Sequence, residues 1–276
     1  MKKRASSIIL IFVLIIGLSL ILYPTISDWW NDFHQSRAIA DYDAILAEME
    51  EEDYTHLFEA AMEYNEQLRQ LKFPLMYYDQ ISGYGDLLNI TGTGVMGYID
   101  IPSIQVELPI YHGTSEGVLQ IAVGHVEGSS LPTGGESTHC VLSAHRGLPS
   151  ARLFTDLDKM QVGDVFTLTV VDRLLTYEVD QILTVLPHEV EPLYVQEGED
   201  FCTLVTCTPY GINTHRLLVR GRRIENAAEV TVKRVTADAV QIRPILVAPM
   251  VAAPVLLLLL ILLIVPKPRN KRRPKL

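Results

Sequence analysis

The sequence predicts a mainly β domain, either a closed barrel or a sandwich, with a helical segment before it and an apolar stretch near each end of the chain. Three observations lead to this. About seven short runs rich in Val, Ile, Leu, Thr and Tyr follow Gly92, a helical periodicity precedes it, and two long stretches carry no charge. A chain of 276 residues is long enough for one well-cored domain with extensions.

The first apolar stretch runs from Ile8 to Tyr23 and follows three basic residues, Lys2, Lys3 and Arg4. As a helix, its roughly 18–20 apolar positions would span about 30 Å, the thickness of the hydrocarbon core of a bilayer. A cleaved signal peptide also begins with basic residues. The run is longer than a typical signal core, however, and no A-x-A-like cleavage site follows it. We therefore expect an uncleaved cytoplasmic N-terminus and transmembrane helix over residues 1–27.

The second apolar stretch covers residues 245–265 and contains Pro249 and Pro254, which membrane helices tolerate. A basic tail, residues 266–276, follows it. Because positively charged segments beside a membrane span stay in the cytoplasm, both termini are predicted to be cytoplasmic. The part of the chain between the two spans would then face the outside of the cell.

The net charge of that exterior part is strongly negative. The chain has 23 basic and 33 acidic residues, and the two tails hold nine of the basic residues and none of the acidic ones. The exterior part therefore has a formal net charge of −19. This argues against nucleic acid or anionic lipid as a partner. It would suit basic partners, although an acidic surface is more commonly only solvated.

Residues 28–91 are predicted to form a helical extension and a connection. Apolar residues recur at three- and four-residue steps from Ala38 to Leu71, without Gly or Pro, which is typical of a helix. The segment from Lys72 to Leu88 contains Pro74 and two glycines and is expected to be irregular.

Residues 92–225 are predicted to form the β domain, and residues 226–244 a linker to the second apolar stretch. Turn residues such as Gly113 and Gly211 separate the β-rich runs. A short helix is expected at Leu153–Met160. The expected strands are Val95–Ile101, Val106–Tyr111, His139–Ala144, Val165–Val171, Leu175–Val185, Thr203–Thr206 and His215–Arg222.

Three cysteines, Cys140, Cys202 and Cys207, lie in the exterior part, and an odd number leaves at least one thiol unpaired. Cys202 and Cys207 are not expected to pair, because five residues of strand separate their Cα atoms by about 16 Å. A disulfide between Cys140 and Cys202 is possible, and the sequence leaves it open. A free thiol outside the cell needs a reason, and catalysis is one.

Cys207 ends one β-rich run and Arg216 stands at the start of the next, so the two residues lie close together if these strands pair. His145 ends another such run. A thiolate can attack a carbonyl, an imidazole can transfer protons, and a guanidinium can stabilise an oxyanion. Each residue alone is more commonly structural, since an isolated Cys behaves as a small buried hydrophobe.

Longer motifs surround these three residues. The segments TCTPYGINTHRLLVRG, from Thr206 to Gly221, and SAHRGLPSARLFTDLD, from Ser143 to Asp158, resemble the active-site signatures of class C, pilin-polymerising sortases. Three further segments are similar to this family: GVMGYIDIP from Gly94, LPIYHGT from Leu108 and GHVEGSSLP from Gly124. The resemblance covers about residues 92–222.

The resemblance implies an eight-stranded, sortase-type closed β-barrel with an N-terminal helical extension. It implies Cys207 as nucleophile, His145 as general acid and base, and Arg216 as the residue that orients the substrate and stabilises the oxyanion. The implied reaction cleaves an LPXTG-like sorting signal after its threonine, holds the acyl group as a thioester, and transfers it to a pilin lysine. No cofactor or metal is implied. Tyr210 and Asn213, in the loop after Cys207, are expected to line the substrate groove.

Class C sortases often carry a lid with an Asp-Pro-aromatic motif, and this chain contains no Asp-Pro dipeptide. Phe73-Pro74 or Tyr77-Tyr78-Asp79 could take its place, but we expect a plain loop. His125 and His139 are expected to be structural.

Three other functions stay open at this stage. They are a wall-anchoring sortase that transfers to a peptidoglycan amine, a surface cysteine protease, and a non-enzymatic acidic receptor. The resemblance favours a two-pass protein of the Gram-positive cell membrane with its catalytic domain outside.

Overall fold

The computed structural model describes residues 2–226. Residues before Asp28 and those from Asp28 onward belong to separate compact units, and the boundary lies inside the first helix, α1 (Lys2–Leu46). Within the described residues, one helical stretch, Ile11–Leu46, is long and apolar enough to cross a membrane, and its most apolar window has no buried residues. The second predicted span, 245–265, and the tail after it lie outside the described residues.

The predicted helix from Ala38 to Leu71 is interrupted in the structure. α1 ends at Leu46 and α2 spans Glu51–Gln70. The interruption has local causes: the Tyr54 hydroxyl donates a hydrogen bond to the last carbonyl of α1, at Leu46, and the Asp53 carboxylate accepts one from the backbone N–H of Glu50 at 3.4 Å. These side chains satisfy backbone groups at the end of α1 and the start of α2. A segment with one continuous helical periodicity therefore folds as two helices.

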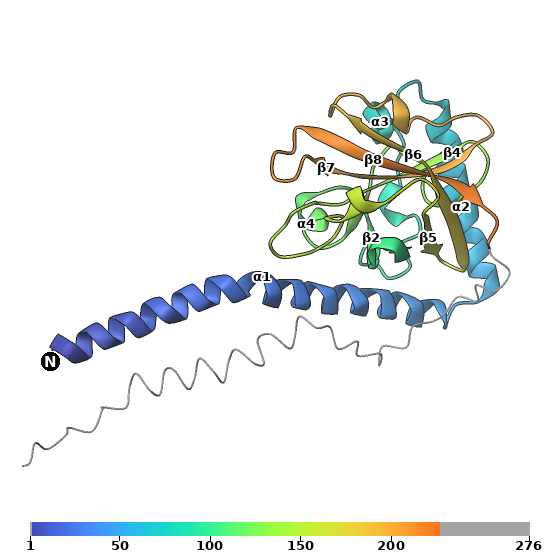
Figure 1. Ribbon diagram of the computed structural model, residues 1–276. Coiled ribbons are helices and arrows are strands. Elements are labelled where there is room, and N and C mark those ends of the chain that lie inside the picture. The colour runs from blue at the N-terminus through green and yellow to red at the C-terminus, as the bar shows by residue number, and fades with distance from the viewer. Residues whose placement is uncertain (1, 227–276) are drawn as a thin grey trace, which may run out of the picture. The chain divides into compact units, whose positions relative to one another are not determined.

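The two helices pack on the barrel through specific contacts. The buried Tyr42 hydroxyl of α1 donates to the carbonyl of Met96 at 3.0 Å and accepts from the N–H of Val171 at 2.8 Å. On α2, the ring of Phe58 lies 3.7 Å from the Arg173 guanidinium. α2 accordingly lies beside the β5–β6 hairpin, β5 (Val165–Val170) and β6 (Arg173–Val185) (Figure 1).

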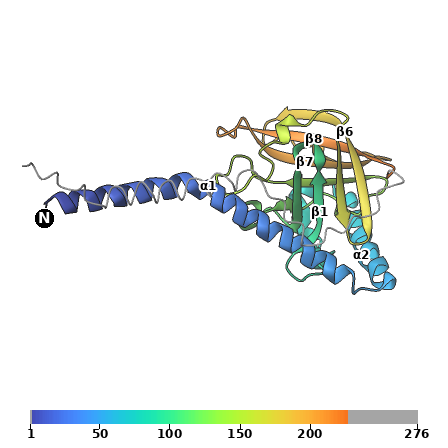
Figure 2. The same cartoon turned by 60° about the horizontal axis from the view of Figure 1, so that its bottom comes forward.

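Eight strands close into a barrel in the order β1-β2-β3-β4-β7-β8-β6-β5. Most pairs are antiparallel, whereas β2–β3 and β4–β7 are parallel. Figure 2 shows the barrel from another side, with β7, β8 and β6 labelled close together. The remaining strands are β1 (Val95–Ile101), β2 (Val106–His112), β3 (Val123–His125), β4 (Thr138–Ser143), β7 (Asp200–Thr208) and β8 (His215–Ile224). The predicted eight-stranded closed barrel is therefore confirmed.

The seven strands expected from composition all form, with ends that shift by a few residues. β3, which the composition did not indicate, is the eighth. The expected helix at Leu153–Met160 is wrong except for one short turn. Within the described residues, four short helical turns connect strands: η3 (Pro102–Ile104), α4 (Glu116–Leu119), η4 (Leu157–Lys159) and η5 (Glu191–Leu193). A fifth, η2 (Tyr84–Asp86), precedes β1.

The connection from Lys72 to Leu88 contains two more short helices, α3 (Pro74–Tyr77) and η1 (Tyr78–Gln80). It packs closely on the β3–β4 loop, since a Cβ added at Gly128 would lie 2.5 Å from the carbonyl oxygen of Pro74. The Tyr84 hydroxyl bonds to Nδ1 of His125 on β3 at 2.9 Å and accepts from the N–H of Gly113 at 2.9 Å. These contacts fasten the connection to the β2–β3 side of the barrel.

Candidate active site

Cys207 and Arg216 are direct partners in the antiparallel ladder between β7 and β8. Cys207 is the second-last residue of β7, and Arg216 is the second residue of β8. Facing residues of neighbouring strands have Cβ atoms about 4.5–5.5 Å apart, so the thiol and the guanidinium leave the sheet from adjoining positions. The sequence-based expectation that these residues lie close together is thus confirmed.

His145 stands two residues beyond the end of β4, on the other side of β7. The β4–β7 ladder continues past the last strand residue, because Ala144 N–H donates to Val205 O at 3.2 Å and Thr206 Oγ1 donates to Ala144 O at 2.8 Å. The parallel register pairs Ser143 with Val205. Continued by two residues, this register brings His145 level with Cys207. The strand order β4-β7-β8 therefore places the cysteine between the histidine and the arginine.

Backbone carbonyls at the end of the β7–β8 loop bind the Arg216 guanidinium. Its Nη1 donates to the carbonyl oxygens of Asn213 at 3.3 Å and His215 at 3.1 Å. Asn213 adopts a left-handed conformation with φ of 61°, and its N–H donates to Pro209 O at 3.0 Å. Asn213 therefore acts here through its backbone carbonyl, which supports Arg216. Its expected place in a substrate groove stays a prediction.

Tyr210 in the same loop is 60% exposed, and its ring covers Gly147, where an added Cβ would lie 2.7 Å from the ring carbon Cε2. The ring therefore bridges the segment after His145 and the segment after Cys207. A neighbouring apolar residue, Ile212, is also exposed, so the loop offers an apolar surface beside the cysteine. The expected contact of Tyr210 with substrate stays a prediction.

A carboxylate that the sequence did not single out approaches the histidine. Nε2 of His145 lies 3.8 Å from Oε2 of Glu116, the first residue of α4. The Glu116 side chain is 72% exposed, so solvent weakens the interaction between the two side chains. No motif could have indicated the contact, since the two residues are joined only by the packing of the β2–β3 connection against the end of β4.

His125 and His139 have structural roles, as expected. His125 is buried and bonds to Tyr84 through Nδ1 and to the carbonyl of Ser130 through Nε2 at 2.9 Å. His139 bonds to the carbonyl of Tyr194 at 3.0 Å and to Oγ1 of Thr203 at 2.7 Å. Burial lowers the pKa of His139 from 6.5 to about 4, so this ring is neutral at neutral pH.

All three thiols are free in the structure, and they differ in burial. Cys140 and Cys202 are buried and face each other in the parallel β4–β7 register, whereas Cys207 is partly exposed. Cys202 and Cys207 lie on the same strand, β7, which keeps them apart as expected. The thiol available to substrate is therefore Cys207.

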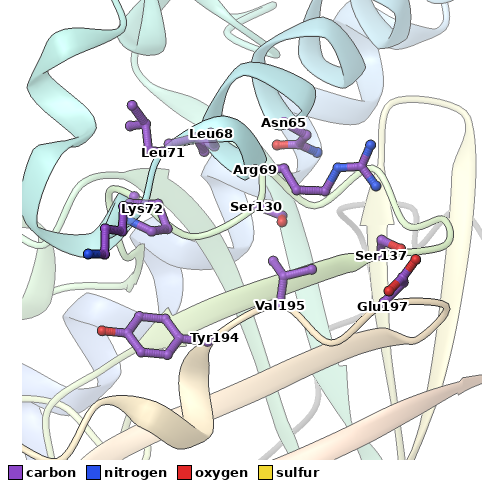
Figure 3. A pocket seen from close by; sticks show the side chains of 12 residues that line it. Asn65, Leu68, Arg69, Leu71, Lys72, Ser130, Ser137, Tyr194, Val195 and Glu197 are labelled. Carbon is purple, nitrogen blue, oxygen red and sulfur yellow. The ribbon is translucent and has the colours of Figure 1, made fainter.

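A pocket shown in Figure 3 lies elsewhere on the described part of the chain. It has a volume of about 400 Å³ and is formed by the C-terminal half of α2 and the segments just before β4 and β7, with Arg69, Lys72, Tyr194 and Glu197 on its wall. Cys207 is at the far end of β7 from these segments, about 20 Å away at about 3.3 Å per residue. This pocket does not belong to the Cys207 site.

The arrangement can perform acyl transfer. A thiol that is accessible to a peptide has an imidazole on one side, able to exchange protons, and a permanent cation on the other, able to stabilise negative charge on oxygen. Within residues 2–226, no group of three His, Cys, Asp or Glu side chains is placed to hold a metal ion.

Comparisons with known proteins agree with this site. Residues 99–224 match the Sortase domain family. The crystal structure of sortase C1 from Streptococcus agalactiae is 52% identical, with a TM-score of 0.64 over 69% of this chain and 100% of that chain. The structure of Streptococcus pneumoniae sortase C is 45% identical, with a TM-score of 0.63 over 70% of this chain and 100% of that chain.

A curated relative, sortase A of Streptococcus agalactiae, is 32% identical over 117 residues, which are 41% of this chain. The match spans only about half, 47%, of the length of that relative. The similarity to the sortase C structures extends over their whole length and over about 70% of this chain. The chain therefore belongs to the sortase family, whose members are cysteine transpeptidases.

Proposed function

We propose that this protein is a membrane-anchored, pilin-polymerising transpeptidase with Cys207 as nucleophile, His145 as general acid and base, and Arg216 as the oxyanion-stabilising residue. The observation that carries the proposal is the register of three neighbouring strands, which puts Cys207 between Arg216 and His145. The sulfur can thus receive a substrate carbonyl between a proton donor and a cation.

In the first half of the reaction, the Cys207 thiolate attacks the carbonyl carbon of the threonine in an LPXTG-like signal. The carbonyl oxygen becomes an oxyanion, and the Arg216 guanidinium donates to it. When the tetrahedral intermediate collapses, the C–N bond to the following glycine breaks, and His145 protonates the departing amine. The product is a thioester on Cys207.

In the second half, a lysine amine of the next pilin subunit gives a proton to His145 and attacks the thioester carbonyl. The C–S bond breaks, the Cys207 thiolate is restored, and an isopeptide bond links the two subunits. One similar structure, that of S. pneumoniae sortase C, is described in terms of pilin substrate specificity, which supports pilin as the substrate class here. The acidic exterior also suits a basic acceptor.

The proposed location is the outer face of a Gram-positive cell membrane. The apolar helical stretch at the N-terminus supports one membrane anchor. The second anchor at 245–265, and with it the two-pass topology with both termini in the cytoplasm, rests on the apolar sequence and the basic tail.

Mass spectrometry of the detergent-solubilised protein mixed with an LPXTG peptide tests the chemistry. We expect a thioester adduct on Cys207, sensitive to hydroxylamine and absent in Cys207→Ala. The matched control is Cys202→Ala, a buried cysteine on the same strand, in which the adduct should persist. Absence of any adduct on the intact protein, under conditions in which the barrel is folded, would overturn the proposal.

The acceptor is tested separately. The acyl-enzyme is offered either a lysine-containing pilin fragment or a peptidoglycan-precursor amine, and the rate of adduct loss is measured for each. Faster transfer to the lysine supports pilin polymerisation. Faster transfer to the wall precursor would identify a wall-anchoring enzyme, and release only to water would identify a protease.

A further inference from the structure

Arg146, the residue after His145, is a cation whose side chain is mostly buried and contacts three different side chains. Its side chain is only 9% exposed, and its Nη2 forms an ion pair with Asp158 of η4. Nη1 donates to Oγ1 of Thr208 at 3.4 Å, and the guanidinium carbon lies 5.8 Å from the ring centroid of Tyr210. The third guanidinium nitrogen, Nε, is buried without a hydrogen-bond partner.

These contacts join the two segments that carry the reacting groups. Thr208 directly follows Cys207, and Arg146 directly follows His145. Asp158 belongs to the connection between β4 and β5, so the same guanidinium also fixes that connection. Arg146 thus ties the residues just after His145 to the end of β7, while the Thr206 side chain ties the residue just before His145 to the same strand.

The rest of the His145 segment is weakly constrained by regular structure. β4 ends at Ser143, and the next regular element in the chain, η4, begins at Leu157. The His145 carbonyl accepts from Phe154 N–H at 3.2 Å, and Gly147 N–H donates to Oγ1 of Thr155 at 3.2 Å. Both of these bonds stay within the β4–β5 connection. Before the histidine, Ala144 bonds to Val205 and Thr206 of β7. After it, the Arg146 side chain forms the corresponding link, to Thr208.

Retention of a buried arginine with an unpaired Nε is unfavourable for stability alone, because a buried donor without a partner loses its hydration. A pair of apolar residues would fill the same space without that loss. A planar guanidinium, in contrast, can reach an acid and a hydroxyl from one rigid fork, which a lysine ammonium cannot reproduce. The geometry of the guanidinium fork therefore suits a residue that holds two segments of the chain in fixed positions.

We propose that Arg146 is a positioning residue that sets the separation of His145 and Cys207 by bonding to Asp158 and Thr208 and by supporting Tyr210. This inference rests on the proposed function of Cys207 and His145. The ring of Tyr210 lies near both the Arg146 guanidinium and Gly147, so the same contacts fix the start of the loop that leads to Arg216 on β8. Arg146 would then help to fix the positions of both His145 and Arg216, which lie on either side of Cys207.

The test compares Arg146→Lys with Arg220→Lys in the full-length protein in detergent. Arg220 is a matched control, because its side chain is 14% exposed and it pairs with Asp180 at 2.8 Å, but it faces Thr203, four residues before Cys207. Thermal melting gives the folded fraction, and rapid-quench mass spectrometry gives the rate of thioester formation per folded molecule at saturating LPXTG peptide.

We expect Arg146→Lys to lower that rate by about tenfold to a hundredfold, since misplacement of reacting groups by about 1 Å can cost about a hundredfold. The KM for the peptide should change far less than kcat. Arg220→Lys should lower the melting temperature without changing the rate per folded molecule. Thr208→Val, which removes one hydrogen bond at constant shape, should produce a smaller loss that is not additive with that of Arg146→Lys.

Equal rates per folded molecule in Arg146→Lys and the intact protein would overturn the positioning role, and so would an equal loss in Arg220→Lys. If Arg146→Lys does not fold, Thr208→Val alone decides: an unchanged rate overturns the proposal. Failure of the intact protein to form a thioester refutes the proposed function instead, so the two failures are distinguishable.

Discussion

Arg216 faces Cys207 across the β7–β8 ladder while its Nη1 donates to two carbonyl oxygens of the connecting loop, those of Asn213 and His215. The loop therefore positions the cation, and the strand register positions the thiol. Because the guanidinium has five N–H groups, donors remain for a substrate after the loop is satisfied.

Replacement of Arg216 by Ala should reduce thioester formation by about a hundredfold to a thousandfold, the usual cost of losing one oxyanion donor. Arg216→Lys should recover only part of this, because an ammonium cannot bond the loop and the substrate in the same geometry. The measurement is the pre-steady-state acylation rate. Arg222→Ala, a half-exposed arginine on the same strand, is the control and should keep the full rate. An Arg216→Ala rate within about threefold of the intact protein would contradict the oxyanion role.

Thiol labelling should separate the three cysteines. In the folded protein, a maleimide reagent should modify Cys207, since Cys140 and Cys202 are 2% and 0% exposed. After denaturation without reductant, all three should react, because the structure holds three free thiols. Peptide mapping by mass spectrometry gives the sites. Labelling of Cys207 alone in the denatured protein would mean that Cys140 and Cys202 form a disulfide.

Stability should fall in mild acid through His139. In the unfolded protein the His139 ring takes up a proton near pH 6.5, while burial lowers its pKa in the folded protein to about 4. Between these two pH values the unfolded state therefore binds more protons than the folded state. Stability from this residue is therefore complete above pH 6.5 and is lost as the pH falls towards 4. At pH 5 the loss should be about 2 kcal/mol, given about 1.4 kcal/mol per pKa unit.

Urea unfolding at pH 7.5 and pH 5 measures this loss, with His139→Gln as the comparison. Gln can still donate to the Tyr194 carbonyl and has no proton to gain, so its pH dependence should be smaller by about the same 2 kcal/mol. Burial raises the pKa of Asp100, Glu107 and Asp200, and these carboxyls stabilise the fold at low pH. Their contribution is the same in both proteins, so the contribution of His139 is obtained by subtracting one pH dependence from the other. Identical pH dependence in both proteins would contradict the assignment.

Gly147→Ala should affect both stability and catalysis. Its φ of 79° is left-handed, which costs a non-glycine residue about 1–2 kcal/mol, and the new Cβ would displace the Tyr210 ring. Gly198→Ala is the matched control, because Gly198 has a φ of 80° and open space around its Cα. Both variants should lose similar stability in urea unfolding, and only Gly147→Ala should slow acylation. A slow Gly198→Ala enzyme would show that the loss reflects general destabilisation.

Local sequence patterns predicted most of the strands because each barrel strand is a short run of β-branched and aromatic residues between turns. β1 illustrates this, since its predicted and observed bounds coincide at Val95 and Ile101. β3 did not show in the composition because three residues, Val123–His125, are too few for a periodic signal. It forms because β2 and β4 offer unpaired backbone groups on either side.

The helical extension was predicted as one unit because periodicity reports which residues face the core, and both α1 and α2 face it. The turn between them depends on a hydrogen bond from Tyr54 back to Leu46, which periodicity does not contain. The same holds for the Lys72–Leu88 connection, whose attachment through Tyr84 joins residues 41 positions apart.

The sequence by itself determined the family and the identities of Cys207, His145 and Arg216 as candidates, because these residues lie in long motifs at strand ends. Only the tertiary structure decided which strands are neighbours, and with them that Cys140 faces Cys202, that Glu116 approaches His145 and that Arg146 ties Thr208 to Asp158. The physical reason is that contacts between segments that are distant in the sequence are set by closure of the whole barrel. No local pattern records it.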